Sequence, residues 1–303
     1  MPYSQIGIWI EAARLRTLPL SVAGILAGNG LALSVNAFSW VLFVGTLLTA
    51  ISFQILSNFA NDYGDGIKGT DNDNRIGPKR ILQQNLISAQ MLFRGIVLTG
   101  IISLILSLGI IVLAFGLAQI FFSIAFLVLA VFAIWAAYKY TAGKGAYGYR
   151  ALGDVFVFVF FGLVAVVGSF FLQANVISPS TLWFSLSIGA YSVGVLNLNN
   201  MRDMQNDAAV GKKTMATILG LRLAKRYHSL LLLFGIIGLV FGICAVAQTE
   251  LHYLPLIVIV PILVQLLKTT KTQKHAAFDE QLKPLALTTF GFSMLFFLTQ
   301  LFF

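Results

Sequence analysis

"WVLFVGTLLTAISFQILSNFANDYGDGIKGTDND", Trp40 to Asp73, begins as an apolar run and ends in a cluster of carboxylates. The run is about twenty residues long, which is typical of a helix that spans a bilayer. Four of the chain's 11 acidic residues follow it closely, at Asp62, Asp65, Asp71 and Asp73. Charged side chains near a membrane are costly unless they are paired, so this cluster predicts a specific cationic partner at the end of the span.

The whole chain has the composition of an integral membrane protein. Its 303 residues are 58% hydrophobic and 10% charged, and the mean hydropathy is +0.88. Nothing at the N-terminus has the pattern of a cleavable signal, so we expect the first helix to direct insertion. Apolar runs of spanning length predict nine transmembrane helices, at roughly 18–35, 40–61, 92–114, 117–138, 151–173, 180–201, 228–248, 253–267 and 285–303.

The basic residues indicate the orientation of these spans. All 20 Lys and Arg lie in the N-terminal segment or in the loops after spans two, four, six and eight, and the other loops have none. By the positive-inside rule, that face and the N-terminus are cytoplasmic in a cell membrane, and the C-terminus lies on the opposite side. The basic tracts are typical of contacts with membrane lipids, and no module for nucleic-acid binding is present.

A second polar cluster repeats the first. Asn58, Asp62 and Asp65 have the helical spacing i, i+4 and i+7, and "NLNNMRDMQND" places Asn199, Asp203 and Asp207 at i, i+4 and i+8. Each set shares one helical face at the same end of its span. We therefore expect one domain over residues 1–303 with two related halves, about 1–150 and 151–303, whose acidic faces converge.

These side chains favour magnesium over other metals. Carboxylates without neighbouring His or Cys are ligands for hard cations, and Mg²⁺ commonly takes one or two carboxylates together with substrate phosphates. A diphosphate is the expected third component. Cations for its remaining charge are close in sequence: Lys68, Arg75, Lys79, Arg80, Lys144, Arg150, Lys212 and Lys213.

Four blocks carry a resemblance to a known family: "EAARLRTLPLSVAG", "LSNFANDYGDGIKGTDNDNRIGPKR", "YGYRALGDVFVFVFFG" and "LNNMRDMQNDAAVGKKT". They resemble the UbiA-type intramembrane prenyltransferases, and most closely the branch that acts on 1,4-dihydroxy-2-naphthoate in menaquinone biosynthesis. The resemblance implies an all-α, multi-pass bundle of about nine helices around a central cavity open to the cytoplasmic side. It also implies Mg²⁺-dependent transfer of a polyprenyl group from polyprenyl diphosphate to the naphthoate. CO2 and a proton would be lost, giving demethylmenaquinone and pyrophosphate.

The resemblance and the residue chemistry together give the expected site. Metal ligands are expected at Asp62, Asp65, Asp71, Asp203 and Asp207, although Asp71 follows Asp65 by six positions where many members have four. Catalytic roles are expected for Asp62, Asp65, Asp203, Asp207 and Lys144. Contacts to the diphosphate or the acceptor are expected from Asn58, Asn61, Lys68, Arg75, Lys79, Arg80, Tyr140, Tyr149, Arg150, Asn199, Lys212 and Arg16.

Some alternatives remain open from the sequence. Arg14 and Arg16 either meet an acceptor carboxylate or anchor the topology, and Asp154 either orients Lys144 or Arg150 or stabilises a helix N-terminus. A sister enzyme would act on 4-hydroxybenzoate or homogentisate, whereas an ion-coupled transporter would carry its acids near the bilayer midplane. We expect His228, His252 and His275 to be interfacial polar residues. Nothing in the sequence indicates an oligomeric state.

Overall fold

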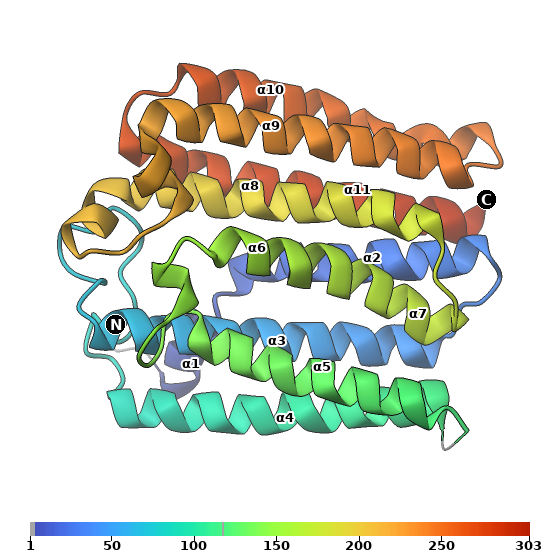
Figure 1. The fold of residues 1–303 in the computed structure, drawn as a ribbon, viewed down its shortest axis with the longest axis horizontal. Helices are drawn as coiled ribbons and strands as arrows, with labels where there is room; N and C mark the ends of the chain where they lie inside the picture. Colours follow the sequence, from blue (N-terminus) through green and yellow to red (C-terminus); the bar gives the residue numbers. More distant parts are fainter. Residues whose placement is uncertain (1–3, 117) are drawn as a thin grey trace.

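The fold, seen in a computed structural model, is a bundle of long helices lying side by side (Figure 1). The structure describes residues 4–116 and 118–303, and within these ranges nine helical segments are long and apolar enough to cross a membrane, as predicted. The helices are α1 (Gln5–Ala13), α2 (Leu18–Ser34), α3 (Trp40–Ile67), α4 (Ala89–Phe115), α5 (Ile120–Lys139), α6 (Gly153–Val157), α7 (Ser169–Ala174), α8 (Pro179–Ala209), α9 (Met215–Val246), α10 (Ile259–Lys271) and α11 (Asp279–Phe302).

The fifth span consists of three segments in two helical forms. A π-helix, Phe158–Gly168, joins α6 to α7. Gly162 in this segment faces α8 so closely that an added Cβ atom would lie 2.7 Å from the carbonyl oxygen of Ser185. π-helical segments are rare and frequently occur at functional sites. Here the segment forms part of the wall of an internal cavity.

The seventh and eighth spans begin earlier than the hydropathy predicts. α9 begins at Met215, because Thr214 and Thr217 form a capping box at its N-terminus. Gly220, with φ 73° and ψ 161°, interrupts its first turns. The eighth span is not short: a 3₁₀ helix, Glu250–Val258, precedes α10, and together they reach from Glu250 to Lys271.

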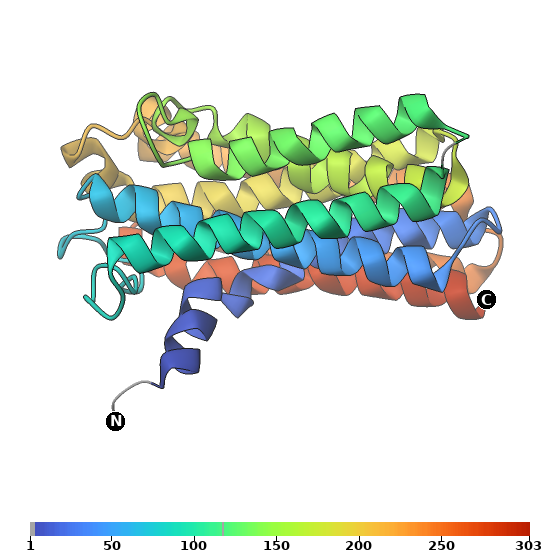
Figure 2. The same cartoon turned by 90° about the horizontal axis from the view of Figure 1, so that it is seen from below.

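α1 is a short helix that hydropathy did not predict. Arg14 follows it with φ 49° and ψ 58°, a left-handed conformation that breaks the helical direction before α2. Figure 2 shows α1 leaving the bundle at this point. Trp9 anchors the short helix, since its ring lies 5.4 Å from the ring of Phe59 on α3.

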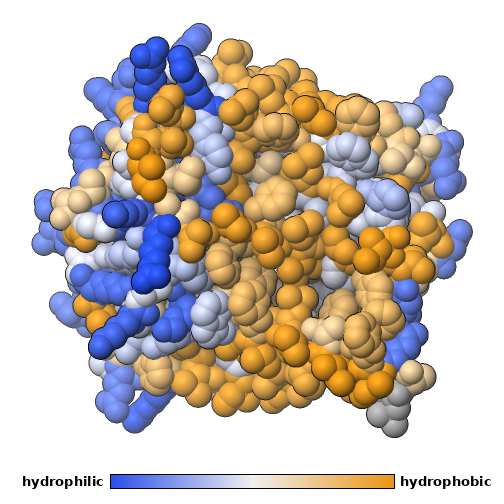
Figure 3. Space-filling view, in the orientation of Figure 1, coloured by the Kyte–Doolittle hydropathy of each residue, from blue (hydrophilic) through white to orange (hydrophobic). Residues whose placement is uncertain are grey.

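The outer surface suits a lipid environment. Large hydrophobic side chains such as Val112, Phe121 and Val260 are exposed. Figure 3 shows hydrophobic side chains across the middle of one face and hydrophilic ones toward its two ends. The exposed apolar surface is therefore a lipid-facing belt of a multi-pass membrane protein.

Candidate active site

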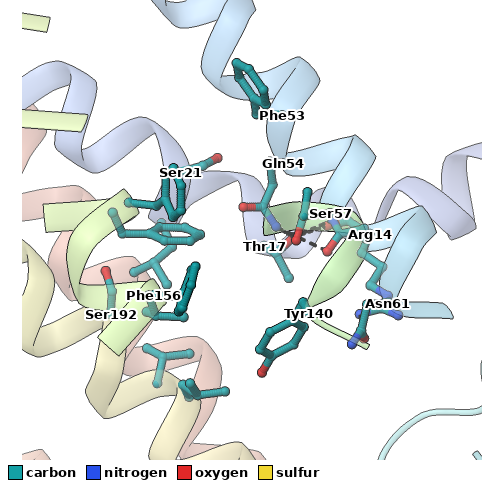
Figure 4. Close-up of a pocket in the computed structure, with 18 of the residues that line it drawn as sticks. Arg14, Thr17, Ser21, Phe53, Gln54, Ser57, Asn61, Tyr140, Phe156 and Ser192 are labelled. Atoms are coloured by element: carbon teal, nitrogen blue, oxygen red, sulfur yellow. Dashed lines mark hydrogen bonds between the residues drawn. The ribbon is translucent and has the colours of Figure 1, made fainter. Parts of the chain in front are cut away.

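A cavity of about 850 Å³ lies inside the bundle and is lined by α2, α3, α4, α5, the whole fifth span, α8 and the start of α11. One end is lined by charged side chains, among them Asp65, Asp71, Arg75, Asp203 and Asp207. The other end is lined by apolar side chains, which include Ile25, Ile110, Phe126, Leu129 and Leu172. Figure 4 shows the middle of this cavity, where polar and aromatic side chains meet.

α3 runs along the whole length of this cavity. Its lining residues extend from Thr46 to Asp65, which corresponds to about 28 Å at the rise of an α-helix. The cavity is thus long enough to hold a charged head at one end and an extended apolar chain at the other. The phenylalanines of the fifth span contribute to its wall through Phe156, Phe160 and Phe161.

The two acidic clusters meet at the charged end. The Nζ atom of Lys212 lies 3.7 Å from Oδ2 of Asp65 and 3.7 Å from Oδ1 of Asp207. The Nε atom of Arg75 lies 3.2 Å from Oδ1 of Asp71 and 3.7 Å from Oδ2 of Asp203. Each cation therefore joins a carboxylate of the first cluster to one of the second, and the clusters converge as their helical spacing predicts.

Asp62 points in a different direction from Asp65. Its carboxylate forms ion pairs with Arg14 and with Nε of Arg80, the latter at 3.5 Å. It lines a smaller neighbouring pocket of about 300 Å³ together with Glu11. Residues three apart on a helix differ in direction by about 60°, so the two carboxylates face adjoining spaces on either side of the arginines.

The second cluster is held by an arginine that the sequence reasoning missed. Arg202 is buried and donates from Nε to Asp203 Oδ1 at 2.9 Å and from Nη2 to Asp203 Oδ2 at 2.6 Å. Its Nη1 atom donates to Asp279 at 2.5 Å, at the start of α11. A signal was present, because Arg202 directly precedes Asp203 inside the predicted cluster. Its contact with Asp279 had no local signal.

Burial shapes the protonation of the charged loop residues. Burial works against the charged form of Lys212, but the carboxylates of Asp65 and Asp207 raise its pKa above the ordinary value. Burial raises the pKa of Asp71, and Arg80 partly offsets this effect. Burial also lowers the pKa values of Arg75 and Arg80. The charged end of the cavity therefore contains buried acidic and basic side chains that stabilise one another through ion pairs.

The donor set fits magnesium bound together with phosphate. Within the described residues, no group of three or more His, Cys, Asp or Glu side chains is arranged to hold a metal alone. Mg²⁺ does not need such a cage, since it usually binds one or two carboxylates and takes its other ligands from water and phosphates. Asp71 Oδ2 is buried without a hydrogen-bond partner, and such an oxygen is an available ligand. The carboxylates that line the charged end, and that could therefore hold the ion, are those of Asp65, Asp71, Asp203 and Asp207.

The expected site residues fall into two groups, those that line the main cavity and those that do not. Those that line the main cavity are Arg16, Asn58, Asn61, Asp65, Asp71, Arg75, Arg80, Tyr140, Asn199, Asp203, Asp207 and Lys212. Those that do not line it are Asp62, Lys68, Lys79, Lys144, Tyr149 and Arg150.

Tyr149 and Lys68 stand just behind the cavity wall. The Tyr149 hydroxyl donates to Asp65 Oδ1 at 2.7 Å, and burial raises its pKa. Lys68 Nζ lies 4.0 Å from the centre of the Tyr149 ring. Tyr149 therefore orients Asp65 and does not face the open space.

Three expected cations lie away from the site. Lys144 and Arg150 are exposed on the loop after α5. Lys79 is exposed too and pairs with Asp73 at 3.6 Å. The path of a loop decides which of its cations turn inward, and sequence proximity to an acidic cluster does not reveal that path.

The structure also shows where Asp154 and two of the histidines lie. Asp154 lies in the first turn of α6, and its carboxylate accepts from the Tyr227 hydroxyl at 2.9 Å, so it pairs with neither Lys144 nor Arg150. His228 was expected at the interface, and this is wrong: it is completely buried inside α9 against α8. His252 Nδ1 accepts from the backbone N–H of Gln248 at 3.0 Å, as a helix-end residue does.

Comparisons with known proteins agree with this geometry. The model of the UbiA prenyltransferase family matches residues 21–283. The chain is 39% identical to 1,4-dihydroxy-2-naphthoate octaprenyltransferase of Escherichia coli (strain K12) over 236 residues, 78% of this chain and 76% of the relative. It is 42% identical to the Haemophilus influenzae protein of the same name over 231 residues, 75% and 74% of the two chains.

Solved structures show the same fold. A UbiA homolog from Archaeoglobus fulgidus bound to GPP and Mg²⁺ aligns with a TM-score of 0.68 at 14% identity, covering 96% of this chain and 99% of that one. The apo structure of a UbiA homolog from Aeropyrum pernix K1 aligns with the same TM-score at 12% identity, covering 94% and 95%. The chain therefore belongs to the UbiA prenyltransferase family and is a membrane prenyltransferase.

Proposed function

We propose that the chain transfers a polyprenyl group from polyprenyl diphosphate to 1,4-dihydroxy-2-naphthoate, with Mg²⁺ as cofactor and with loss of the acceptor's carboxylate as CO2. The observation that carries this proposal is the meeting of Asp65 with Asp207, and of Asp71 with Asp203, at the charged end of a cavity whose other end is apolar. The names of the relatives from E. coli and H. influenzae supply the acceptor.

The charged end binds the diphosphate. Arg75, Arg80 and Lys212 line this part of the cavity and donate to phosphate oxygens once a metal shares the carboxylates. Mg²⁺, when bound, neutralises charge on the diphosphate and so makes it a better leaving group. The same cations stabilise the charge that the diphosphate gains while the allylic C–O bond breaks.

The transfer step balances without a further reactant. The C–O bond of the allylic diphosphate breaks, and its electron pair leaves with the diphosphate. A ring carbon of the electron-rich naphthoate forms the new C–C bond, and the electron pair of the bond to the carboxyl carbon stays on the ring as CO2 and a proton leave. The direct product is the hydroquinone, and a separate two-electron oxidation gives demethylmenaquinone.

The cavity wall also protects the reacting centre. Tyr140 and Phe156 line the section between the charged and apolar ends (Figure 4). Burial raises the pKa of Tyr140, so its ring stays a neutral phenol. Such rings exclude water and present π-faces to an allylic cation.

The orientation in the membrane follows from the loops. The loop residues that contribute to the charged end, Asp71, Arg75 and Lys212, belong to the basic loops that the positive-inside rule assigns to the cytoplasm. We place the site at the cytoplasmic side of the cell membrane and the C-terminus on the opposite side. Water-soluble naphthoate then enters from the cytoplasm, and the polyprenyl chain occupies the apolar part.

The test is a reaction with purified protein, Mg²⁺ and a labelled allylic diphosphate. Three acceptors are offered in parallel: 1,4-dihydroxy-2-naphthoate, 4-hydroxybenzoate and homogentisate. We expect pyrophosphate and CO2 release with the naphthoate. Turnover of another acceptor alone would assign the chain to a sister activity, and absence of pyrophosphate release with every acceptor would contradict the proposal.

A further inference from the structure

A small hydrogen-bond network lies between the charged end and the apolar end of the cavity. It joins Thr17, at the start of α2, to Gln54 and Asn58 on α3 (Figure 4). All three residues line the cavity. The direction of each hydrogen bond in this network follows from the backbone groups at its edge.

Asn58 fixes the first direction. Its Nδ2 atom donates to the carbonyl oxygen of Ala13 at 2.8 Å and to Thr17 Oγ1 at 3.0 Å. A backbone carbonyl can only accept, so the NH2 group of Asn58 must face Ala13. Oδ1 of Asn58 is then turned toward Gln54.

Thr17 fixes the second direction. Its hydroxyl donates to the carbonyl oxygen of Arg14 at 2.9 Å. Because the hydroxyl has only one hydrogen and donates it to Arg14, it can only accept hydrogen bonds from other groups. Gln54 therefore meets two acceptors, Asn58 Oδ1 and Thr17 Oγ1, each at 3.2 Å from its Nε2 atom. Both amide hydrogens of Gln54 are used.

The amide oxygen of Gln54 is the group left over. Gln54 is 9% exposed, and Figure 4 shows its oxygen directed away from the network, toward the open part of the cavity. None of the hydrogen bonds among the described residues ends on this oxygen. This oxygen is open to the cavity, so the donor of a bound ligand can reach it, and a ligand without a donor there would cover it and leave it unpaired at a cost in free energy.

The position of Gln54 matches the place of the aromatic acceptor. It precedes Asp65 by eleven positions on α3, which is about 16 Å along the helix axis. The cavity continues from Asp65 past Gln54, so Gln54 lies between the charged end and the apolar end. Phe156 also lines this section of the cavity, so an aromatic ring here has an apolar face beside it and an acceptor at its edge.

We propose that Oε1 of Gln54 accepts a hydrogen bond from a ring hydroxyl of the aromatic acceptor and so fixes the orientation of the ring. This assignment rests on the proposed function. An oxygen that can only accept selects a hydroxyl and disfavours a carboxylate, so the carboxylate of the acceptor faces the arginine end of the cavity. The hydrogen bond strengthens as the ring loses electron density to the allylic cation.

The test compares wild type with Gln54→Met, which keeps the length of the side chain and removes its hydrogen bonding. We expect the KM for 1,4-dihydroxy-2-naphthoate to rise about tenfold and the KM for polyprenyl diphosphate to stay unchanged. Ser21→Ala is the matched control, because Ser21 lines the same cavity but its hydroxyl already donates to the carbonyl oxygen of Leu18 at 2.9 Å. This control should keep both KM values.

The two mono-O-methyl ethers of the naphthoate, used as competitive inhibitors, separate contact with the hydroxyl from a structural role. Methylation keeps electron donation to the ring but removes the donor hydrogen. Wild type should bind one of the two ethers about tenfold more weakly than the parent, and Gln54→Met should lose this discrimination. A structural role would instead weaken both substrates and preserve the discrimination.

Equal binding of the parent and both ethers by wild type would overturn the inference without any variant. An unchanged KM for the naphthoate in Gln54→Met would overturn it as well. Failure of wild type to turn over the naphthoate at all is a different result, because it contradicts the proposed function.

Discussion

The Nε atom of Arg75 lies 3.7 Å from Oδ2 of Asp203, so the loop after the first acidic cluster contacts the second. Lys212 makes the reciprocal contact from the loop after the second cluster to Asp65. These cross-contacts bring four carboxylates to one end of a single cavity. They also place the cations that a diphosphate needs beside the carboxylates that a metal needs.

Asp65→Asn and Asp207→Asn should each abolish most of the turnover. Either change removes a charged oxygen ligand and leaves Lys212 with one carboxylate, so we expect a loss of at least about 100-fold in kcat. Pyrophosphate release measures the effect, and size-exclusion chromatography in detergent checks that the protein is folded. Asp73→Asn is the control, because the Asp73 carboxylate is 92% exposed. Near-normal kcat in either cavity variant would contradict the metal assignment.

Lys212→Met and Lys144→Met should differ sharply. Lys212 lines the cavity and contacts two carboxylates, whereas Lys144 is exposed on its loop. We expect Lys212→Met to lower kcat/KM for the diphosphate by about 100-fold or more and Lys144→Met to change it by less than about twofold. Steady-state kinetics with varied diphosphate measures both. Equal losses would restore Lys144 as a catalytic residue.

The stability of the metal-free protein should depend on pH through Lys212. The carboxylates around Lys212 raise its folded pKa above the ordinary value of 10.5. The stabilisation is therefore fully present below that value and is lost as the pH rises through the folded pKa. Melting temperatures of wild type and Lys212→Met, measured in detergent from about pH 9 to about pH 12, should converge toward high pH. A constant difference would show that the ion pairs do not stabilise the fold.

Gly64→Ala should destabilise the protein although alanine favours helices. A Cβ atom at Gly64 would lie 2.5 Å from the carbonyl carbon of Thr141 and 2.7 Å from the amide nitrogen of Ala142. Backbone cannot move aside as a side chain can, so we expect a loss of about 1–3 kcal/mol. The matched control is Gly109→Ala, where nothing lies within 4 Å of the added atom. Chemical denaturation in detergent compares the two variants, and equal stability would contradict the close packing.

The helical spacing of polar residues predicted more of this site than sequence proximity did. Asn58 and Asp65 share a helical face, as do Asn199 and Asp207, and all four line one cavity. Periodicity works here because α3 and α8 are regular helices whose side-chain directions follow from residue number.

Residues in loops could not be placed in this way. Lys144 turns to solvent and Lys212 turns inward, although both were predicted from the same argument of proximity in sequence. The acceptor oxygen of Gln54 also had no sequence signal, because its direction depends on a threonine and a backbone carbonyl from a different helix. Tertiary contacts determine the directions of these side chains, and a single sequence does not show which residues will be in contact.

Arg14 has two structural roles, one through its backbone conformation and one through the charge of its side chain. Its backbone adopts the left-handed turn after α1, and its guanidinium neutralises Asp62. Glycine would adopt this turn without steric cost but would leave the Asp62 carboxylate with Arg80 as its cationic partner, whereas lysine would keep a charge and retain the steric cost of the turn. Glycine at this position would keep the turn and remove the charge, whereas lysine would keep the charge and the steric cost of the turn. A comparison of the two variants would therefore separate the effect of the backbone conformation from the effect of the charge.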